Sequence, residues 1–297
     1  MKFQLIFNPH AGGGKGKKLF PAILSKIKRL GGPVDWVLSQ HPQEALAAAF
    51  RAQERGFDLL IACGGDGTVH SLLPALVNRS TVLGVIPIGG ANDLARNWGI
   101  PLDLDEALEV LSKGQPRAVD VIGTQSGTYI AGAVGVGFDA AVIERVRAWR
   151  QSWKGLLPYP AGAALEFFRY HPPVIFVAAG SWQYRGSIWQ LLCTNIPRYG
   201  LFLKIAPPSK IDDGLMEICL IPDSSRAHLL LHALLLPFFG FKHFPAARTL
   251  SAPRLTVESL FPLKFHGDGE LIGYTPADLR VLPTALQVMM PIAPGSG

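Results

Sequence analysis

The sequence predicts an α/β domain built on a parallel sheet, followed by a mainly β domain built as a sandwich of antiparallel sheets. Three observations predict this fold class. Short apolar runs alternate with helix-like stretches at the start of the chain, as in a parallel sheet covered by helices. After Gln115-Pro116 the apolar runs are punctuated closely by Gly and Pro, as in antiparallel sheets. The 297 residues are enough for two hydrophobic cores.

We expect the first domain at residues 1–118 and the second at residues 119–285, with residues 286–297 forming a C-terminal strand and tail that can return to the first domain. Short runs made mostly of apolar residues predict strands, and the continuous run Leu59–Cys63 predicts one buried on both faces. In the first domain these strands are Phe3–Phe7, Val34–Leu38, Leu59–Cys63 and Leu83–Ile86. Helical periodicity between them predicts helices at Leu19–Leu30, Pro42–Arg55 and Thr68–Leu76.

The second domain is expected to consist mainly of strands. These are Arg117–Ile122, Tyr129–Val136, Val174–Gly180, Ile188–Asn195 and Met216–Ile221. Three helical segments interrupt them, at Phe138–Arg150, near Gly155–Tyr170 and near Ser224–Leu236. The last 30 residues are expected to return to short strands.

Composition excludes a disordered chain, because hydrophobic residues make up 48% of the sequence and charged residues only 17%. The net charge of +6 favours anionic partners such as nucleotides, acidic lipid headgroups or nucleic acid. Three cysteines without a CxxC pair predict neither a disulfide framework nor a zinc site, and favour a reducing, cytosolic compartment. The longest apolar region, Leu229–Phe241, falls short of the roughly 20 residues that a spanning helix needs. We therefore expect no membrane-spanning segment, although part of the chain can lie on a membrane.

The most informative motif is Gly64-Gly65-Asp66-Gly67-Thr68, which separates a predicted strand from a predicted helix. Glycines let bare backbone N–H groups approach an anion at a helix N-terminus, where the peptide dipoles favour negative charge. The motif predicts a phosphate site, and an ordinary glycine-rich turn is the alternative.

Two further loops follow the first and fourth predicted strands. The loop Asn8–Lys18 contains Lys15 among glycines, but it lacks the spacing and the Ser or Thr of a Walker A loop. Phosphate contact by Lys15 and a solvated basic loop remain equal alternatives. The loop Pro87–Arg96 carries Asp93 near a helix start, where a helix cap is the alternative. In a parallel sheet Asp66 and Asp93 would share the C-terminal edge, where ligands bind.

Three motifs belong to the second half of the chain. Asp213-Gly214 and Asp268-Gly269 both have hairpin turns as the simpler explanation. Gly135-x-Gly137-x-x-Ala140 also matches a dinucleotide fingerprint, but no acid follows at the end of a second parallel strand. We interpret His70 and His266 as incidental, since neither has a nucleophile partner in the sequence.

Together these segments resemble the diacylglycerol kinase catalytic family, which includes bacterial lipid kinases and sphingosine kinases and is distantly similar to NAD kinases. The family pattern is Asn-Pro-x-Ser/Ala-Gly, Gly-Gly-Asp-Gly-Thr and Pro-x-Gly-Thr-x-Asn-Asp. The chain matches it at Asn8–Gly12, Gly64–Thr68 and Pro87–Asp93. Further matches in the same order are Gly135–Ala140, Asp213–Leu215 and Asp268–Glu270, so the resemblance covers nearly the whole chain.

The resemblance implies a nucleotide-binding first domain and a lipid-binding second domain. It implies an ATP-dependent lipid kinase that uses Mg²⁺ to phosphorylate a lipid hydroxyl, such as that of diacylglycerol. The implied catalytic residues are Asp268, as general base, and Glu270, near the nucleotide and its metal. The implied nucleotide-binding residues are Asn8, Lys15, Ser39, Gly64, Gly65, Asp66, Gly67, Thr68, Gly89, Gly90, Asn92 and Asp93. The implied structural Mg²⁺ site consists of Lys210, Asp213 and Leu215.

One departure from the family is Gly90, which stands where the family has Thr, so a hydroxyl that contacts the nucleotide is lost. The missing hydroxyl makes a lipid-binding pseudokinase one alternative. A NAD kinase-like enzyme is another, because NAD kinases share the Gly-Gly-Asp-Gly core.

The predicted partners are ATP, a lipid with a free hydroxyl and the inner face of the membrane. We expect no nucleic acid as a partner. If the protein forms an oligomer, we expect a homodimer. Aromatic residues alternate with basic ones along 147–170, a mixture suited to a membrane surface. A buried core helix is the alternative for Phe167 and Phe168.

Overall fold

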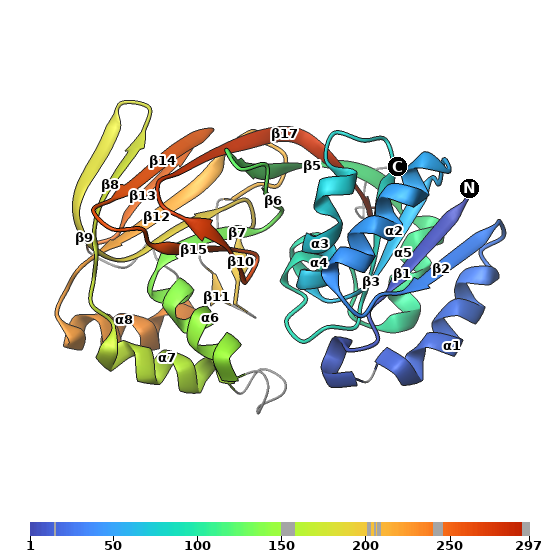
Figure 1. Ribbon diagram of the computed structural model, residues 1–297, viewed down its shortest axis with the longest axis horizontal. Helices are drawn as coiled ribbons and strands as arrows, with labels where there is room; N and C mark the ends of the chain where they lie inside the picture. The colour runs from blue at the N-terminus through green and yellow to red at the C-terminus, as the bar shows by residue number, and fades with distance from the viewer. Residues whose placement is uncertain are drawn as a thin grey trace. The chain divides into compact units, whose positions relative to one another are not determined.

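The computed structural model describes residues 1–14, 16–149, 158–200, 203–204, 206, 209–239 and 246–292. Its contacts divide the chain into two compact units (Figure 1). Unit 1 contains Met1–Val119 and the chain from Thr284 onward, and unit 2 contains Asp120–Pro283. The final strand therefore begins in unit 2 and ends in unit 1.

Unit 1 is built on a parallel sheet with the strand order β4, β3, β1, β2. The strands are β1 (Phe3–Phe7), β2 (Val34–Leu38), β3 (Leu59–Gly64) and β4 (Val82–Pro87). Phe3 lies opposite both Leu59 and Val34, so the carboxyl ends of these strands lie level at one edge of the sheet. The last strand, β17 (Ala277–Met290), joins β4 in parallel, with Val288 opposite Leu83.

The helices of unit 1 cover this sheet. They are α1 (Gly16–Lys28), α2 (Pro42–Glu54), α3 (Asp66–Leu76), α4 (Asp93–Asn97) and α5 (Leu104–Lys113). Ile23 and Ile27 of α1 join Leu108 and Leu111 of α5 in a core with alternate side chains of β1 and β3. Helix α2 turns its buried alanines toward the sheet and packs against α3. Helix α5 was absent from the sequence expectations, although Asp103 caps its first turn by accepting N–H bonds from Asp105 and Glu106.

Unit 2 is a β sandwich. Its strands are β5 (Gln115–Thr124), β6 (Tyr129–Ile130), β7 (Ala133–Gly137), β8 (Val174–Ala179), β9 (Trp182–Thr194), β10 (Arg198–Tyr199), β11 (Leu203–Lys204), β12 (Met216–Pro222), β13 (Arg248–Ala252), β14 (Arg254–Ser259), β15 (Lys264–Gly267) and β16 (Glu270–Tyr274). Strand β9 pairs with β8 through its first half and with β7 and β12 through its second half. The sandwich core collects inward side chains from both layers, such as Val136, Leu191, Ile218, Val257 and Leu279.

Three helices belong to unit 2: α6 (Phe138–Trp149), α7 (Pro158–Arg169) and α8 (Arg226–Phe239). They lie on the outer side of the layer formed by β7, β9 and β12, where Trp189, Leu192 and Leu229 form a second core. The predicted helices at Phe138–Arg150 and Gly155–Tyr170 correspond to α6 and α7, and residues 150–157 lie outside the described part of the chain.

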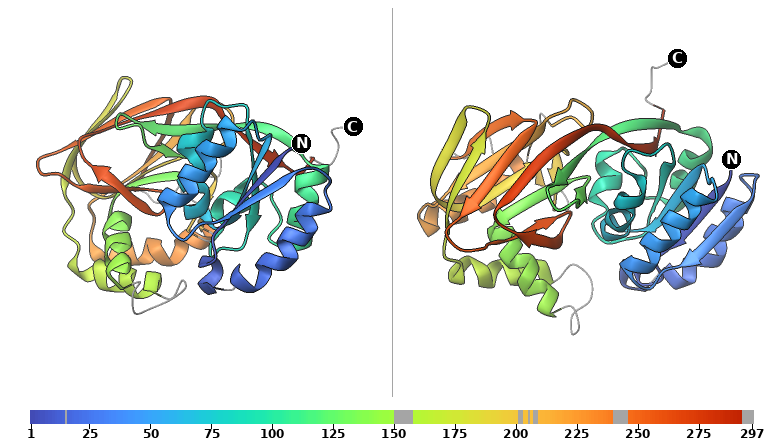
Figure 2. Two further views of the ribbon diagram at one scale, coloured as in Figure 1. Left: turned by 45° about the vertical axis from the view of Figure 1, so that its right-hand side comes forward. Right: turned by 45° about the horizontal axis from the view of Figure 1, so that its top comes forward.

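Two expectations about strands are wrong. The predicted strand Tyr129–Val136 is divided into β6 and β7 by Ala131 and Gly132. The predicted short strands near the end of the chain include one strand of 14 residues, β17, seen as the long red arrow in Figure 2. Strand β17 continues through Pro283. The next residue, Thr284, has a backbone φ of 52°, and this irregularity lies where the strand changes partners, a place where proline is tolerated.

Among the described residues, no helix has both the length and the apolar character needed to cross a membrane.

Candidate functional site

The glycine loop after β3 is held together by contacts that only glycine permits. Gly64 ends β3, and a Cβ atom there would lie 2.1 Å from Oγ1 of Thr68. The same Thr68 hydroxyl accepts a hydrogen bond from Nδ2 of Asn8, at 3.2 Å. Gly65 occupies the N-cap of α3, and no side chain caps that end of the helix. The backbone N–H groups of the loop thus belong to a helix N-terminus of the kind that binds phosphate.

The second glycine loop crosses the first at backbone level. A Cβ atom on Gly89 would lie 2.4 Å from Cα of Gly65, so the two loops approach more closely than any side chain allows. Asn92 fastens this second loop by accepting a hydrogen bond from Gly89 N–H at 3.0 Å and donating one to Gly89 C=O at 3.1 Å. The predicted glycines therefore bring the two loops together at the C-terminal edge of the sheet.

Asp66 and Asp93 are neighbours at this edge. The Asp66 carboxylate accepts N–H bonds from Asp93 at 3.1 Å and from Leu94 at 2.9 Å. Asp66 therefore caps α4 from the neighbouring loop, a structural role that the sequence did not predict. The Asp93 carbonyl accepts a hydrogen bond from Nδ2 of Asn97 at 2.7 Å, and the Asp93 side chain is buried.

Of the remaining predicted nucleotide residues, the structure describes Ser39, Gly67 and Gly90. Ser39 follows β2, is buried, and donates a hydrogen bond from Oγ to the His41 carbonyl at 2.7 Å. Gly90 is exposed beside Gly89. Gly67 lies in the first turn of α3. Lys15 lies outside the described residues, and the glycines before it, Gly12–Gly14, have left-handed φ values of 60°, 71° and 92°.

The thiol of Cys63 lies directly before the glycine loop, and burial raises its pKa well above the ordinary value for cysteine. A buried thiol that stays protonated is not a nucleophile. The loop is thus suited to binding rather than to covalent catalysis.

In unit 2, Asp268 and Gly269 form the two-residue turn between β15 and β16, with φ values of 51° and 84°. Positive φ at both positions is typical of an Asp-Gly hairpin, so this motif does form the hairpin turn that the sequence also predicted. The turn does more than connect two strands, however. The Asp268 carboxylate accepts three backbone N–H bonds, from Ala131 at 3.0 Å, Gly132 at 2.8 Å and Ala133 at 3.0 Å.

These three bonds explain why the predicted strand Tyr129–Val136 is interrupted. The amides of residues 131–133 turn toward Asp268 instead of continuing one strand ladder. Asp268 returns a backbone bond, from its own N–H to the Ala133 carbonyl at 2.8 Å. The carboxylate is consequently fixed in one orientation, and Glu270 follows at the start of β16.

The interpretation of His266 as incidental is wrong. Its ring is fully buried, Nε2 lies 2.7 Å from Oδ2 of Asp139, and Tyr199 stacks on it at 5.8 Å between ring centroids. Gly135 makes this pair possible, because a Cβ atom there would lie 2.0 Å from the Asp139 carboxylate. Since β7 pairs antiparallel with both β9 and β15, the dinucleotide-fingerprint alternative for this motif is also excluded.

The loop Lys210–Leu215 is a tight turn anchored on a buried acid. Asp120 accepts a hydrogen bond from Gly214 N–H at 2.6 Å, and Asp213 accepts one from Leu215 N–H at 3.1 Å. One carboxylate together with main-chain carbonyls is a donor set that suits Mg²⁺. Within the described ranges, no group of three or more His, Cys, Asp or Glu side chains is placed to hold a metal ion.

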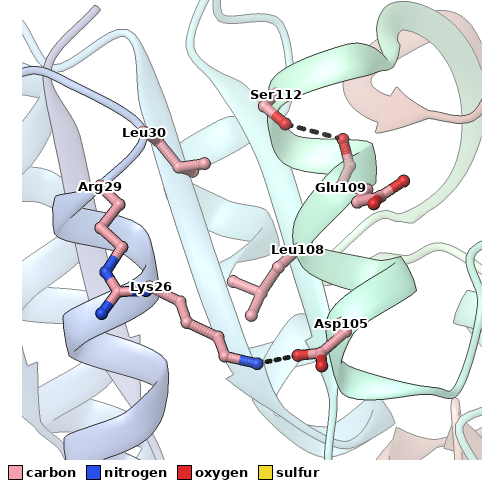
Figure 3. Close-up of a pocket in the computed structure, with 7 residues that line it drawn as sticks. All are labelled: Lys26, Arg29, Leu30, Asp105, Leu108, Glu109 and Ser112. Atoms are coloured by element: carbon pink, nitrogen blue, oxygen red, sulfur yellow. Dashed lines mark hydrogen bonds and ion pairs between the residues drawn. The ribbon is translucent and has the colours of Figure 1, made fainter.

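A pocket also occurs in unit 1 between α1 and α5, where Lys26 and Asp105 form an ion pair (Figure 3). Arg29, Leu108 and Ser112 also line it. No residue of the glycine loops contributes to this pocket, so it is not the candidate site.

Comparisons with known proteins agree with this arrangement. A family model described as the diacylglycerol kinase catalytic domain matches residues 2–124. A second, described as the YegS C-terminal NAD kinase beta sandwich-like domain, matches residues 132–290. The fold, the glycine loops and the two matched models define a kinase that acts on lipids. The chain belongs to the diacylglycerol kinase catalytic-domain family.

Relatives of similar length support the assignment. The chain is 29% identical over 294 residues to the diacylglycerol kinase of Bacillus subtilis (strain 168), covering 97% of this chain and 96% of the relative. It is 28% identical over 298 residues to that of Mycobacterium tuberculosis (strain H37Rv), covering 98% and 95%. A diacylglycerol kinase structure from Bacillus anthracis shares the fold with a TM-score of 0.80, at 20% identity and 98% coverage of both chains. The predicted family, fold class and lipid kinase activity are confirmed, and the NAD kinase-like and pseudokinase alternatives are not retained.

Proposed function

We propose that the protein transfers the γ-phosphate of ATP to the hydroxyl group of diacylglycerol or a closely similar lipid, with Mg²⁺ as the metal. The name of the relatives from Bacillus and Mycobacterium supports diacylglycerol as the acceptor. The two crossed glycine loops support a nucleotide as the donor, since they present a helix N-terminus without a side-chain cap.

Each unit has its own part in this reaction. In unit 1 the backbone N–H groups of Gly64–Thr68 bind the phosphates, and Lys15 adds a positive charge. Asn8, Ser39 and the Gly89–Asp93 loop complete the nucleotide site. Asp66 and Asp93 are the carboxylates of this unit that would hold Mg²⁺, directly or through water. When bound, the metal neutralises charge on the phosphates.

Asp268 is the proposed general base. The lipid hydroxyl oxygen forms a bond to the γ-phosphorus, the bond from that phosphorus to the ADP oxygen breaks, and the hydroxyl proton passes to the Asp268 carboxylate. The single observation that carries this assignment is the set of three N–H bonds from residues 131–133, which fixes the carboxylate in one orientation. A general base must first lie within hydrogen-bond reach of the proton that it accepts, and its pKa is the second requirement.

The Asp213 loop is the proposed structural Mg²⁺ site, with main-chain oxygens of Lys210 and Leu215 as further ligands. Peripheral binding at the inner face of the membrane follows from the lipid substrate and from the net charge of +6. A homodimer remains the oligomer to test.

The substitution Asp268→Asn tests the base. The amide would retain one acceptor oxygen but would turn an NH₂ donor toward a backbone N–H, so we expect a loss of roughly 1–3 kcal/mol in stability. Below the melting temperature of the variant, kcat with ATP, Mg²⁺ and diacylglycerol should fall by about 10²–10⁴-fold.

The matched control is Glu258→Gln, which neutralises an exposed acid of the same unit. It should keep wild-type kcat. A folded Asp268→Asn variant that turns over at the wild-type rate would show that another group accepts the proton.

A further inference from the structure

Helix α8 exposes apolar side chains along one side. Leu230 and Leu234 lie four residues apart, as do Leu231 and Leu235, so the four share one face of the helix. All four are exposed, and Leu234 keeps 64% of its surface accessible. Leu229 points the other way and is 4% exposed in the core beneath the helix. The exposed face is thus additional to the residues that anchor α8.

Phe168, on α7, is a further exposed apolar side chain of unit 2. It is 79% exposed and follows Phe167, whose ring packs against Trp189 in the core. Arg226, at the start of α8, donates hydrogen bonds to the carbonyls of Phe167 and Tyr170 and lies 4.8 Å from the Trp189 ring centroid. These contacts fasten the first turn of α8 to the end of α7, and the two helices lie side by side in Figures 1 and 2. We call Phe168, Leu230, Leu231, Leu234 and Leu235 the leucine surface.

Two long stretches of the chain that contain the leucine surface carry no negative charge. No Asp or Glu occurs between Asp223 and Glu258, or between Glu166 and Asp212. Arg169 and Arg226 flank the surface residues in the sequence. Glu166, the acid nearest to Phe168 in the sequence, is buried and paired with Arg145. An apolar face whose nearest charged residues in the sequence are arginines is complementary to an anionic lipid surface. Two copies of the same face would bring their arginines together, which disfavours a dimer as its occupant.

We propose that the leucine surface is the membrane-docking face of this enzyme, with α8 lying in the bilayer plane and its leucines inserted among the acyl chains. A helix of 14 residues is too short to span the roughly 30 Å hydrocarbon core but long enough to lie in it. The proposal rests on the proposed function, because a kinase that phosphorylates diacylglycerol must reach a lipid that resides in a bilayer. It adds that apolar insertion, and not charge alone, holds the enzyme there.

Vesicle flotation tests this directly. The full-length wild type should float with vesicles of phosphatidylcholine and phosphatidylglycerol, and should still do so at about 0.5 M salt, where surface charges are largely screened. Leu230→Gln with Leu234→Gln should weaken partitioning at that salt concentration by about tenfold or more. Phe50→Gln with Leu102→Gln, which changes two exposed apolar residues of unit 1, should leave partitioning unchanged.

A fluorescent label gives a second readout that does not depend on removing contacts. The three native cysteines are buried, so a cysteine introduced by Leu234→Cys can be labelled selectively with an environment-sensitive dye. Its emission should shift to the blue and brighten on adding vesicles. The same dye after Leu102→Cys should not respond.

Activity separates this proposal from the proposed function. The leucine variant should phosphorylate a short-chain diacylglycerol dissolved as monomers at the wild-type rate, yet lose about tenfold or more on long-chain diacylglycerol in vesicles. Wild type inactive on both substrates would overturn the proposed function. A leucine variant that floats and works on vesicles like wild type, or a wild type released entirely by salt, would overturn the leucine surface.

Discussion

Single atoms decide how closely the two loops of unit 1 can meet. A methyl group on Gly89 would overlap the Gly65 backbone, and one on Gly64 would overlap the Thr68 hydroxyl. Gly90 is under no such restriction: it is exposed and does not have a left-handed φ. The family residue Thr can therefore be restored at position 90 without disturbing the crossing of the loops.

We predict that Gly90→Thr lowers the KM for ATP. A regained hydroxyl contact should contribute about 0.5–1.5 kcal/mol to ATP binding. This free energy corresponds to a KM for ATP that is about two- to tenfold lower. Steady-state kinetics at saturating lipid would measure it, with Gly90→Val as the control of the same shape but without the hydroxyl. Equal KM values for Gly90→Thr and Gly90→Val would contradict the hydroxyl contact.

The pair formed by His266 and Asp139 joins β15, which leads into the Asp268 turn, to the start of α6. We predict that His266→Leu destabilises the protein by roughly 1–3 kcal/mol, because the Asp139 carboxylate loses its partner next to a buried apolar group. Urea unfolding would measure the change.

A double-mutant cycle with Asp139→Ala serves as the control for His266→Leu. It should return a coupling of about 0.5–3 kcal/mol. Independent, additive effects of the two substitutions would mean that the 2.7 Å contact carries no stability.

Sequence reasoning found the residues that lie in motifs, Asp268 among them, and missed the distant partners that hold them in place. Gly64, Asp66 and Asn92 were predictable because a glycine loop between a strand and a helix is a local pattern. The partners of Asp268 lie 135–137 residues away, and His266 lies 127 residues from Asp139. No spacing rule in the sequence indicates such pairs, so only the fold reveals them.

At the level of secondary structure, the apolar residues predicted the strands of unit 1 within about a residue; β1, β3 and β4 are buried on both faces, whereas β2 is partly exposed. Prediction failed where backbone groups bind a side chain or where a strand changes its pairing partner. Residues 131–132 satisfy an alternating pattern, yet their amides bind Asp268. Similarly, Pro283 suggests a break, but β17 continues past it because the strand exchanges one partner for another at that point.

The cross-strand pair between β14 and β17 gives a pH prediction. Arg254 donates two hydrogen bonds to Asp278, at 2.9 and 2.7 Å, and these hold the pKa of the Asp278 carboxyl below its ordinary value of 3.8. Because the folded-state pKa is lowered, the pair stabilises the folded protein above that ordinary value and loses this contribution as the pH falls through the lowered one.

Asp278→Asn should therefore lower the urea midpoint at neutral pH, and the difference from wild type should shrink as the pH falls below about 4. Glu258→Gln, on the neighbouring strand, is the control. A difference that grows with acidity would have the wrong sign for this pair.

At the scale of the whole molecule, the first unit is assembled from both ends of the chain. Ala285, Leu286, Val288, Met289 and Met290 are buried within it. Burial of each large apolar side chain contributes about 1.5–3 kcal/mol. Their sum is therefore comparable to the whole free energy of unfolding of a domain, about 5–15 kcal/mol. The sequence expectation that the tail can return to the first domain did not specify this contribution, because a sandwich strand and a sheet strand look alike in a run of apolar residues.

We predict that a chain ending at Pro283 fails to fold unit 1, whereas a chain ending at Ile292 folds it. Limited proteolysis with and without ATP would distinguish them: the shorter chain should be cut rapidly throughout residues 1–119, and ATP should give no protection. Protease resistance of that region in the shorter chain would contradict the contribution of β17.

The shared strand has a consequence for biosynthesis. The ribosome makes residues 1–119 before unit 2, and β17 only after it, so the sheet of unit 1 stays incomplete while the whole of unit 2 is synthesised. Until β17 emerges, β4 lacks its partner on that side and offers an unpaired edge to chaperones and other nascent chains. A chain interrupted before β17 therefore lacks the strand that completes the sheet of unit 1.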